Sequence, residues 1–181
     1  GSDALIDANN VTGNGGNGLW LCGEANTIKD SEAAVHANAI DANGDWGIYA
    51  YVEHAMTDIS LCNKVTGNAS GGIYIDGQDL RFLGIHNNNI ADNAAWGLLN
   101  DSAETVDALS NWWGDLSGPY HVTNNPTGLG DAVSDLVSFE PWLTQSCAPS
   151  NIAVAFSASA YAVSPGNRIS EQSTRFTPNS S

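Results

Sequence analysis

The chain has 181 residues, of which 20 are Asp or Glu and 5 are Lys or Arg, so its formal net charge at pH 7 is −15. This charge argues against nucleic acid and anionic membranes as partners, and against an anionic polysaccharide unless a cation intervenes. A chain of this length buries one hydrophobic core. Little Lys beside much Asn, Ser, Thr and Gly suits a secreted or cell-surface protein.

A short pattern occurs four times in the first hundred residues. In every copy an Asn is followed two residues later by Val or Ile, five residues later by a second Asn, and nine residues later by Gly. The copies begin at Asn9, Asn38, Asn63 and Asn88. A period of about 25 residues indicates stacked supersecondary units rather than one continuous fold. We expect the two Asn rows to be structural, because stacked amides satisfy turn backbone groups and each other.

Each unit predicts three short strands. The strand after the first Asn carries Val11, Ile40, Val65 and Ile90. The strand after the Gly alternates apolar and outward residues, and its inward column contains Leu19, Ile48, Ile73 and Leu98. A third, less regular strand carries Ile28, Ile59 with Leu61, Leu83 with Ile85, and Val106. Asn and Gly at the turns permit positive φ. The sequence therefore predicts an all-β, right-handed parallel β-helix, a solenoid.

Three regions are expected along the chain. Residues 1–110 form the β-helix coils, residues 111–145 a terminal coil and cap, and residues 146–181 a linker and extended tail. Residues 152–164 alternate apolar and small side chains, which predicts an added strand on the parent coil or on a neighbouring molecule. The first residue lies inside a repeat, so we expect a piece of a longer β-helix. Its open strand edge, like the tail, could support a homo-oligomer.

The repeats resemble those of bacterial secreted proteins with right-handed parallel β-helix repeats, the superfold of pectate-lyase-like and polygalacturonase-like enzymes. A second resemblance lies in the end segment, in Asn111-Trp112-Trp113-Gly114, the Asn125–Val137 stretch and Phe139-Glu140-Pro141-Trp142. It implies a terminal coil and cap, but no particular reaction. Residues 152–164 also resemble the opening strand of a Calx-β-type immunoglobulin-like module, here truncated. The Asp-Asp and Gly-His-Gly motifs of polygalacturonases are absent.

Outward residues of the Gly-led strands should form rows, because successive coils stack about 4.8 Å apart. The first row is Trp20, Tyr49, Tyr74 and Leu99; the second is Cys22, Tyr51, Asp76 and Asp101; the third is Glu24, Glu53, Gln78 and Ala103. Flat aromatic rings stack on sugars, and carboxylates bind hydroxyl groups. Trp20, Tyr49, Tyr51 and Tyr74 are therefore the candidate polysaccharide-binding residues. The alternative is an aromatic ladder that only stabilises the sheet.

Asp76 and Asp101 are the candidate catalytic pair. One strand spacing should place their carboxyl groups about 5 Å apart, as in retaining glycosidases. Glu53 is an alternative acid, and a solvated pair or a cation site is the competing interpretation. A lyase is disfavoured, since Lys64 and Arg81 are the basic residues of the central repeats. We expect a glycoside hydrolase acting on a neutral polysaccharide; the alternative is a non-catalytic surface, adhesin or structural module.

No cofactor is expected, although Asp115, Asp131 and Asp135 leave calcium open. The four histidines show neither metal-ligand spacing nor a Ser/His/Asp arrangement. Three cysteines leave at least one unpaired, and we expect them to be buried small residues with at most one disulfide.

Overall fold

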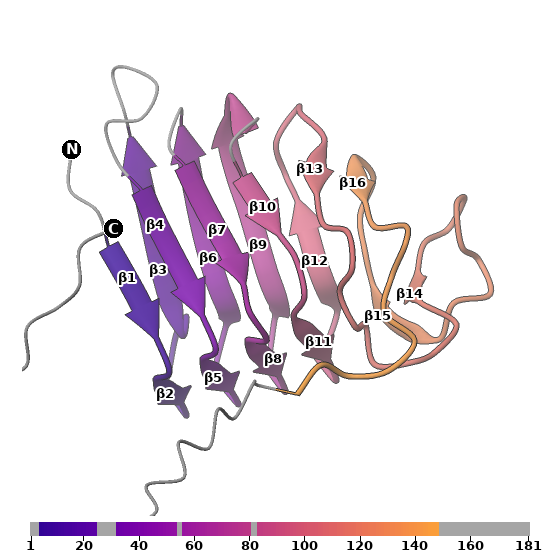
Figure 1. The fold of residues 1–181 in the computed structure, drawn as a ribbon, viewed down its shortest axis with the longest axis horizontal. Coiled ribbons are helices and arrows are strands. Elements are labelled where there is room, and N and C mark those ends of the chain that lie inside the picture. Colours follow the sequence, from indigo (N-terminus) through magenta and orange to yellow (C-terminus); the bar gives the residue numbers. More distant parts are fainter. Residues whose placement is uncertain (1–3, 25–31, 54–55, 81–82, 149–181) are drawn as a thin grey trace, which may run out of the picture. The chain divides into compact units, whose positions relative to one another are not determined.

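The computed structural model describes residues 4–24, 32–53, 56–80 and 83–148. These residues form sixteen β-strands and no α-helix (Figure 1). The chain divides into two units, residues 1–150 and 151–181, and all described residues belong to the first. The strand expected at 152–164, and its immunoglobulin-like alternative, lie outside the described residues.

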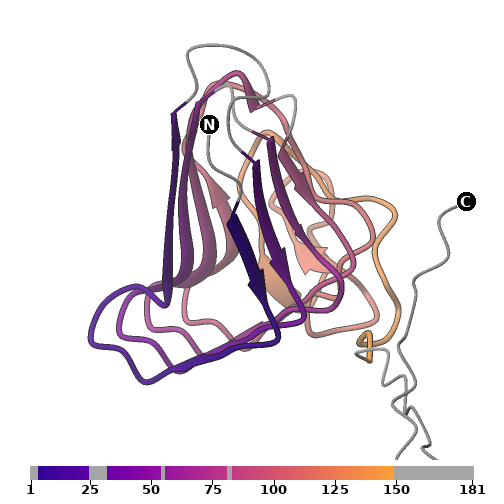
Figure 2. The same cartoon turned by 60° about the vertical axis from the view of Figure 1, so that its left-hand side comes forward.

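Three parallel sheets, here named A, B and C, run along the stacked coils. Sheet A contains β1 (Ala4–Asp7), β4 (Glu32–His36), β7 (Met56–Ser60), β10 (Leu83–Ile85), β13 (Val106–Asp107) and β16 (Val137–Ser138). Sheet B contains β2 (Asn10–Thr12), β5 (Ala39–Asp41), β8 (Lys64–Thr66) and β11 (Asn89–Ala91). Sheet C contains β3 (Leu19–Glu24), β6 (Trp46–Glu53), β9 (Gly71–Gln78) and β12 (Trp96–Asn100). A separate pair joins β14 (Pro119–Tyr120) to β15 (Gly130–Ala132). The three sheets surround one core (Figure 2), which confirms the predicted parallel β-solenoid.

The predicted inward columns are confirmed residue by residue. In sheet B, strand pairing aligns Val11, Ile40, Val65 and Ile90. In sheet C it aligns Leu19, Ile48, Ile73 and Leu98. In the second, third and fourth coils these side chains are 0% exposed, so the core is a stack of aliphatic layers. Such packing is the main source of stability in a parallel sheet, since no single coil can bury its own apolar face.

Sheet A differs from the prediction at one described position. Its confirmed buried residues are Ile59, Leu83, Ile85 and Val106. The inward placement of Leu61 is wrong: this residue follows β7 at a φ of 57° and is 59% exposed, because the chain turns there. Ile28 lies outside the described residues. In β4, the neighbour of β7 in sheet A, the buried residue is Val35, which is in register with Ile59.

Two ladders of side-chain amides run along the turns, as predicted for the Asn rows. Ladder 1 contains Asn9, Asn38, Asn63, Asn88 and Asn111; ladder 2 contains Asn14, Asn43, Asn68, Asn93 and, in the last place, Asp131. At each step the backbone N–H and Nδ2 of one residue donate to the side-chain oxygen in the next coil, over 2.8–3.3 Å. Nδ2 also donates back to a carbonyl of the preceding coil, as from Asn63 to Val35 O at 2.7 Å.

The Gly of each repeat is required by a close approach between the chain and ladder 2. A Cβ added at Gly47 would lie 2.7 Å from Asn68 Nδ2 and 2.7 Å from Val65 Cγ1. Gly18 and Gly72 have equivalent contacts with the ladder-2 residues of the next coil, Asn43 and Asn93. The glycine therefore lets each sheet-C strand start directly against the ladder.

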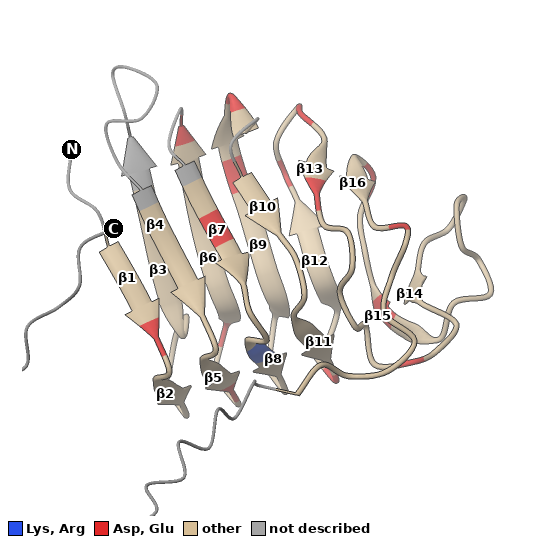
Figure 3. Ribbon diagram, in the orientation of Figure 1, with Lys and Arg blue, Asp and Glu red and all other residues tan. Residues whose placement is uncertain are grey.

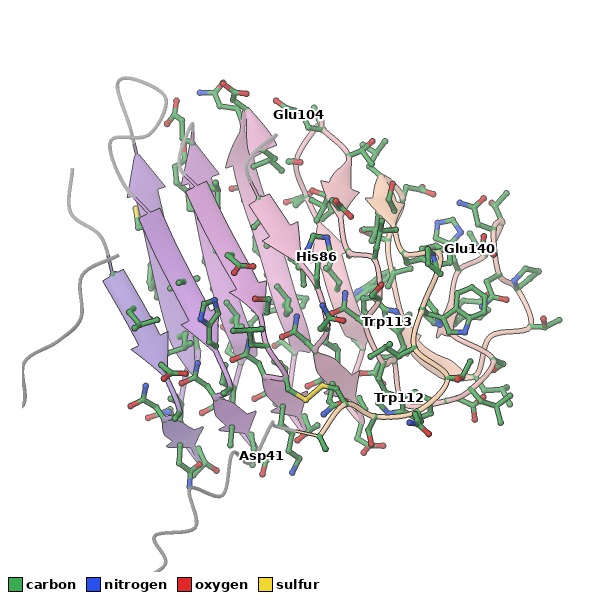
Figure 4. All side chains as sticks on the ribbon, in the orientation of Figure 1. Asp41, His86, Glu104, Trp112, Trp113 and Glu140 are labelled. Carbon is green, nitrogen blue, oxygen red and sulfur yellow. A yellow bond between two sulfur atoms is a disulfide. The ribbon has the colours of Figure 1, made fainter. Side chains whose placement is uncertain are left out.

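The end segment closes the core with larger side chains. Asn111 extends ladder 1. Trp113, labelled in Figure 4, is 0% exposed. The bridge between Asn89 and Trp112 places Trp113 beyond Ile90, in the sheet-B column. Its indole N–H has no hydrogen-bond partner among the described residues.

One disulfide joins distant parts of the described chain. Cys62 and Cys147, 85 residues apart, are bonded (Figure 4), and Asn89 holds the Cys147 backbone through N–H and carbonyl hydrogen bonds of 2.8 Å each. Cys22 is free, as the odd number predicts, but it is exposed rather than buried.

Candidate functional site

The outer face of sheet C brings the predicted site residues together. Strand pairing aligns Trp20, Tyr49 and Tyr74 with Leu99 in one row. The second row aligns Cys22, Tyr51 and Asp76, and the third aligns Glu24, Glu53 and Gln78. Asp101 comes directly after β12, where its backbone N–H donates to Ile75 O at 2.8 Å. Strand pairing therefore confirms the predicted rows for the residues within β3, β6, β9 and β12, whereas Ala103, the last predicted member of the third row, lies outside β12.

The first row is a continuous aromatic ladder. The ring centroids of Tyr49 and Tyr74 lie 4.7 Å apart at an interplanar angle of 15°, and Trp20 tilts against Tyr49 at 5.5 Å. Trp46, which the sequence analysis did not include, tilts against Tyr74 at 5.2 Å. A Cβ at Gly71 would lie 2.1 Å from the Trp46 ring, so that glycine leaves space for the indole. The sequence signal that could have predicted this role of Trp46 is its position directly before the repeat glycine, Gly47.

The stacking leaves the aromatic rings unequally available to a ligand. Tyr74 has Tyr49 on one side and Trp46 close by, so much of its ring surface is already in contact. Tyr49 lies between Tyr74 and Trp20. Trp20 is 72% exposed and contacts the ladder through Tyr49. Trp20 is thus the ladder residue with the most open ring surface.

The three candidate carboxylates each accept hydrogen bonds within this face. Tyr74 Oη donates to Asp101 Oδ2 at 2.6 Å, and the Gly77 backbone N–H donates to Asp76 Oδ1 at 2.6 Å. Glu53 accepts a short hydrogen bond from the Gln78 side-chain amide and a long one of 3.4 Å from Tyr51 Oη. Bonds of this kind orient the carboxylates beside the aromatic row.

The Tyr74 phenol is held in its protonated form. Its hydrogen bond to Asp101 is the largest cause, and burial and the negative charge of Asp101 act in the same direction; together they raise the pKa of Tyr74 well above its ordinary value. Tyr74 is therefore a hydrogen-bond donor to Asp101 over the whole physiological pH range.

Sheet A carries polar contacts that the sequence analysis did not predict. His36 Nε2 lies 2.9 Å from Asp58 Oδ2, and Ser60 Oγ donates to the same oxygen at 2.9 Å. His86 Nε2 lies 3.0 Å from Asp107 Oδ1, and His86 is labelled in Figure 4. The Ser60 hydroxyl donates to the Asp58 carboxylate and not to the His36 imidazole. The three residues therefore do not form a Ser–His–Asp triad, in which the serine hydroxyl bonds to the histidine. The sequence does carry a signal for these contacts: a His stands two residues before the ladder-1 Asn in two coils, at His36 and His86.

The acidic residues named for calcium have structural partners. Asp115 Oδ1 accepts from the Ser117 N–H and hydroxyl, which lowers its pKa, and Asp131 terminates ladder 2. Asp135 Oδ1 lies 3.2 Å from His121 Nε2. Within residues 4–24, 32–53, 56–80 and 83–148, no group of three or more His, Cys, Asp or Glu residues is arranged to hold a metal ion.

Asp and Glu residues far outnumber Lys and Arg in the described part of the chain (Figure 3). Of the five Lys and Arg residues in the chain, Lys64 on β8 is the one that falls in the described part. No helix in that part is long and apolar enough to cross a membrane.

Fold and site together define a parallel β-solenoid protein with an aromatic and acidic face. Comparisons with protein-family models, curated proteins and solved structures find no match for the chain. The resemblance to bacterial secreted β-helix proteins stays a prediction.

Proposed function

We propose that this is a secreted or cell-surface carbohydrate-active protein of the bacterial β-helix type, and that it binds a neutral polysaccharide on the outer face of sheet C. The observation that carries the proposal is the aromatic ladder that leads to an exposed Trp20 and runs beside Asp76, Asp101 and Glu53. Aromatic rings supply apolar contact to the C–H faces of sugars, and carboxylates accept hydrogen bonds from their hydroxyl groups.

Charge and cysteine chemistry support the type of ligand and the compartment. A net charge of −15, with Lys64 as the described basic residue, disfavours an anionic polymer. The disulfide between Cys62 and Cys147 suits an oxidising compartment outside the cytosol.

We propose different roles for the aromatic residues, because their rings are unequally exposed. Trp20, with the most exposed ring, would stack on a sugar unit. Tyr49, Tyr74 and Tyr51 would offer ring edges and hydroxyl groups along the chain of sugars. This division differs from a flat platform in which every ring stacks on its own sugar.

Binding is tested by titrating the protein with a panel of neutral polysaccharides and measuring affinity by calorimetry or affinity electrophoresis. Trp20→Ala should weaken binding by about tenfold or more, because a stacked aromatic contact is lost. The matched control is Tyr120→Ala, which removes another exposed aromatic residue away from sheet C and should leave affinity unchanged. Equal affinities of the Trp20 variant and the parent protein would rule out this face as the binding site.

Hydrolysis is a second candidate function, favoured by Asp76 and Asp101 lying at corresponding positions of neighbouring coils. Strand spacing puts such carboxyl groups about 5 Å apart, the separation of a retaining pair. Because Tyr74 donates a hydrogen bond to Asp101, Asp101 would be the ionised nucleophile. It would attack the anomeric carbon while Asp76 gives its proton to the leaving oxygen; water would then release the sugar, with Asp76 as base.

Hydrolysis is tested by detecting new reducing ends. Asp76→Asn and Asp101→Asn should each abolish turnover while melting and polysaccharide affinity are kept, since an amide can act neither as nucleophile nor as acid. Asp92→Asn, at an exposed turn, is the matched control. Full activity in both site variants would direct attention to Glu53, and an inactive parent that still binds would leave the binding function alone.

A further inference from the structure

The carboxylates of sheet A and those of sheet C have different partners. On sheet A, Asp58 and Asp107 each lie within 3.0 Å of a histidine nitrogen. On the outer face of sheet C, no Lys, Arg or His among the described residues forms an ion pair with Asp76, Asp101 or Glu53. The negative charge of this face is therefore not neutralised within the described part of the chain.

The positions of Asp76 and Asp101 add a repulsion to this charge. Strand pairing aligns Asn100 with Ile75, so Asp101, directly after β12, stands opposite Asp76 in the neighbouring coil. Adjacent strands lie about 4.8 Å apart, and like charges directly opposite each other destabilise a sheet. Asp101 is exposed and Asp76 is half-buried, so solvent reaches both. A positively charged ligand at this row would relieve the repulsion.

The hydrogen bonds of the face show what kind of cation fits. The donors that hold the three carboxylates are Tyr74 Oη for Asp101, the Gly77 N–H for Asp76, and the Gln78 amide and Tyr51 Oη for Glu53. These donor atoms are engaged, whereas Asp76 Oδ2 and Asp101 Oδ1 accept from no described residue. Beside the carboxylates the face therefore offers acceptors, and it lacks donors.

A protonated primary amino group matches this surface, because it carries three N–H donors, no acceptor and one positive charge. A sugar hydroxyl, in contrast, brings an acceptor together with its donor. The hydroxyl of Tyr49 has no hydrogen-bond partner among the described residues, so one group of the ladder remains for a sugar hydroxyl. Ammonium groups and sugar rings thus each find a complement on the same face.

We infer that the outer face of sheet C selects a polysaccharide of amino sugars, with unsubstituted and protonated amino groups, over a neutral polysaccharide of the same backbone. This inference rests on the proposed binding function and is independent of hydrolysis. The ammonium groups would bind along the row of Asp76 and Asp101 through charge-assisted hydrogen bonds, while the sugar rings contact the aromatic ladder.

Two other cations fit the face less well. A metal ion requires a cluster of ligands, and the described residues contain no group of three or more His, Cys, Asp or Glu arranged to hold one. A lysine-rich peptide carries ammonium groups, but its flexible aliphatic stems have no ring to place on Trp20. The aromatic ladder beside the carboxylates therefore favours the amino sugar.

The test measures the affinity of the full chain for a soluble glucosamine oligosaccharide and for its N-acetylated form. Calorimetry is done at low ionic strength and at a pH where the amino groups and the carboxylates are charged. The two ligands share their rings and linkages, and they differ in charge. We expect the amino form to bind about tenfold or more tightly than the acetylated form. Asp76→Asn and Asp101→Asn should each reduce this ratio by about threefold and leave the affinity for the acetylated form unchanged.

The matched control is Asp92→Asn, which makes the same change in net charge at an exposed turn outside sheet C and should keep the ratio. An equal reduction in all three variants would overturn the inference, because net charge rather than this face would then attract the amino form. Equal affinities of the parent for both ligands would also overturn it, yet leave binding of neutral polysaccharides in place, which the panel of such polymers tests separately. A lysine oligopeptide that binds as tightly, with the same dependence on Asp76 and Asp101, would overturn it in favour of a basic peptide.

Discussion

The inside of the coils and the outer face of sheet C are built from the same strands but follow different rules. Inside, each column repeats one kind of residue, and Ile48, Ile73 and Leu98 are fully buried. Outside, the aligned row changes from Trp20 through two tyrosines to Leu99. A repeated inner column is what stacking requires, whereas a varied outer row is free to acquire a binding function. The inner positions should therefore control stability, and the outer ones should control ligand binding.

The largest expected loss of stability comes from breaking a buried ladder. Asn63 is 0% exposed, donates to Val35 O, Ser60 O and Asn88 Oδ1, and accepts from Asn38. Asn63→Ala should lower the free energy of unfolding by about 4 kcal/mol, because several buried polar groups lose their partners. Asn9→Ala, at the exposed start of the same ladder, should cost about 1 kcal/mol or less. Similar losses in urea-induced unfolding would contradict the proposed importance of ladder burial.

A smaller loss is expected from the aliphatic column. Ile73→Ala should cost about 3 kcal/mol by removing buried apolar surface and leaving a cavity between coils. Leu99→Ala, on the outer row of the neighbouring strand, should cost about 1 kcal/mol or less. The two variants remove side chains of similar size from opposite faces, so chemical denaturation compares the faces directly. A Leu99 variant as unstable as the Ile73 variant would show that the outer row also carries the fold.

The repetition of one kind of residue in each inner column explains why the sequence predicts the solenoid so fully. Stacking forces Asn, aliphatic and Gly residues to recur at fixed spacing, so Val65 or Gly47 can be placed by counting alone. Prediction fails where the repeat is irregular or ends. Leu61 lies in a turn between two copies, and Trp113, after the last copy, extends a column whose earlier members are aliphatic. Register also predicts which residues share the outer face. Register does not predict ring orientation, which depends on side-chain packing in three dimensions. The stacking of Tyr49 on Tyr74 and the contact of Trp46 with Tyr74 could therefore not be predicted from the sequence.

The pH dependence of stability distinguishes two carboxyl groups of the end segment. Burial raises the pKa of Asp131, although hydrogen bonds from Asn93 oppose the shift. A raised folded-state pKa means that the stability contribution is full below the unfolded-state pKa and is lost as pH rises through the folded-state value. Compared with Asp131→Asn, the parent should therefore gain stability as the pH is lowered from neutral.

Asp115 provides a control of opposite sign. Hydrogen bonds from Ser117 lower its pKa, so its contribution is present above the unfolded-state pKa and is lost as pH falls through the folded-state value. Relative to Asp115→Asn, the parent should lose stability on acidification. Melting curves at several pH values measure both differences, and two differences of the same sign would contradict the assignments.

The smallest expected change in stability is on the outer face itself. Tyr74→Phe keeps the ring stacked on Tyr49 but removes the hydroxyl that donates to Asp101, so we expect a loss of about 1 kcal/mol or less. The phenol is better observed by alkaline titration of tyrosinate absorbance. In the parent, Tyr74 should ionise later than an ordinary tyrosine, because its pKa is raised chiefly by the bond to Asp101. The late step should disappear in Tyr74→Phe. In Asp101→Asn it should move to lower pH, since an amide carries no charge to hold the phenol proton. A late step that stays in place in Asp101→Asn would mean that burial, rather than Asp101, holds the proton, and the hydrogen bond would then be no guide to the role of Asp101 in hydrolysis.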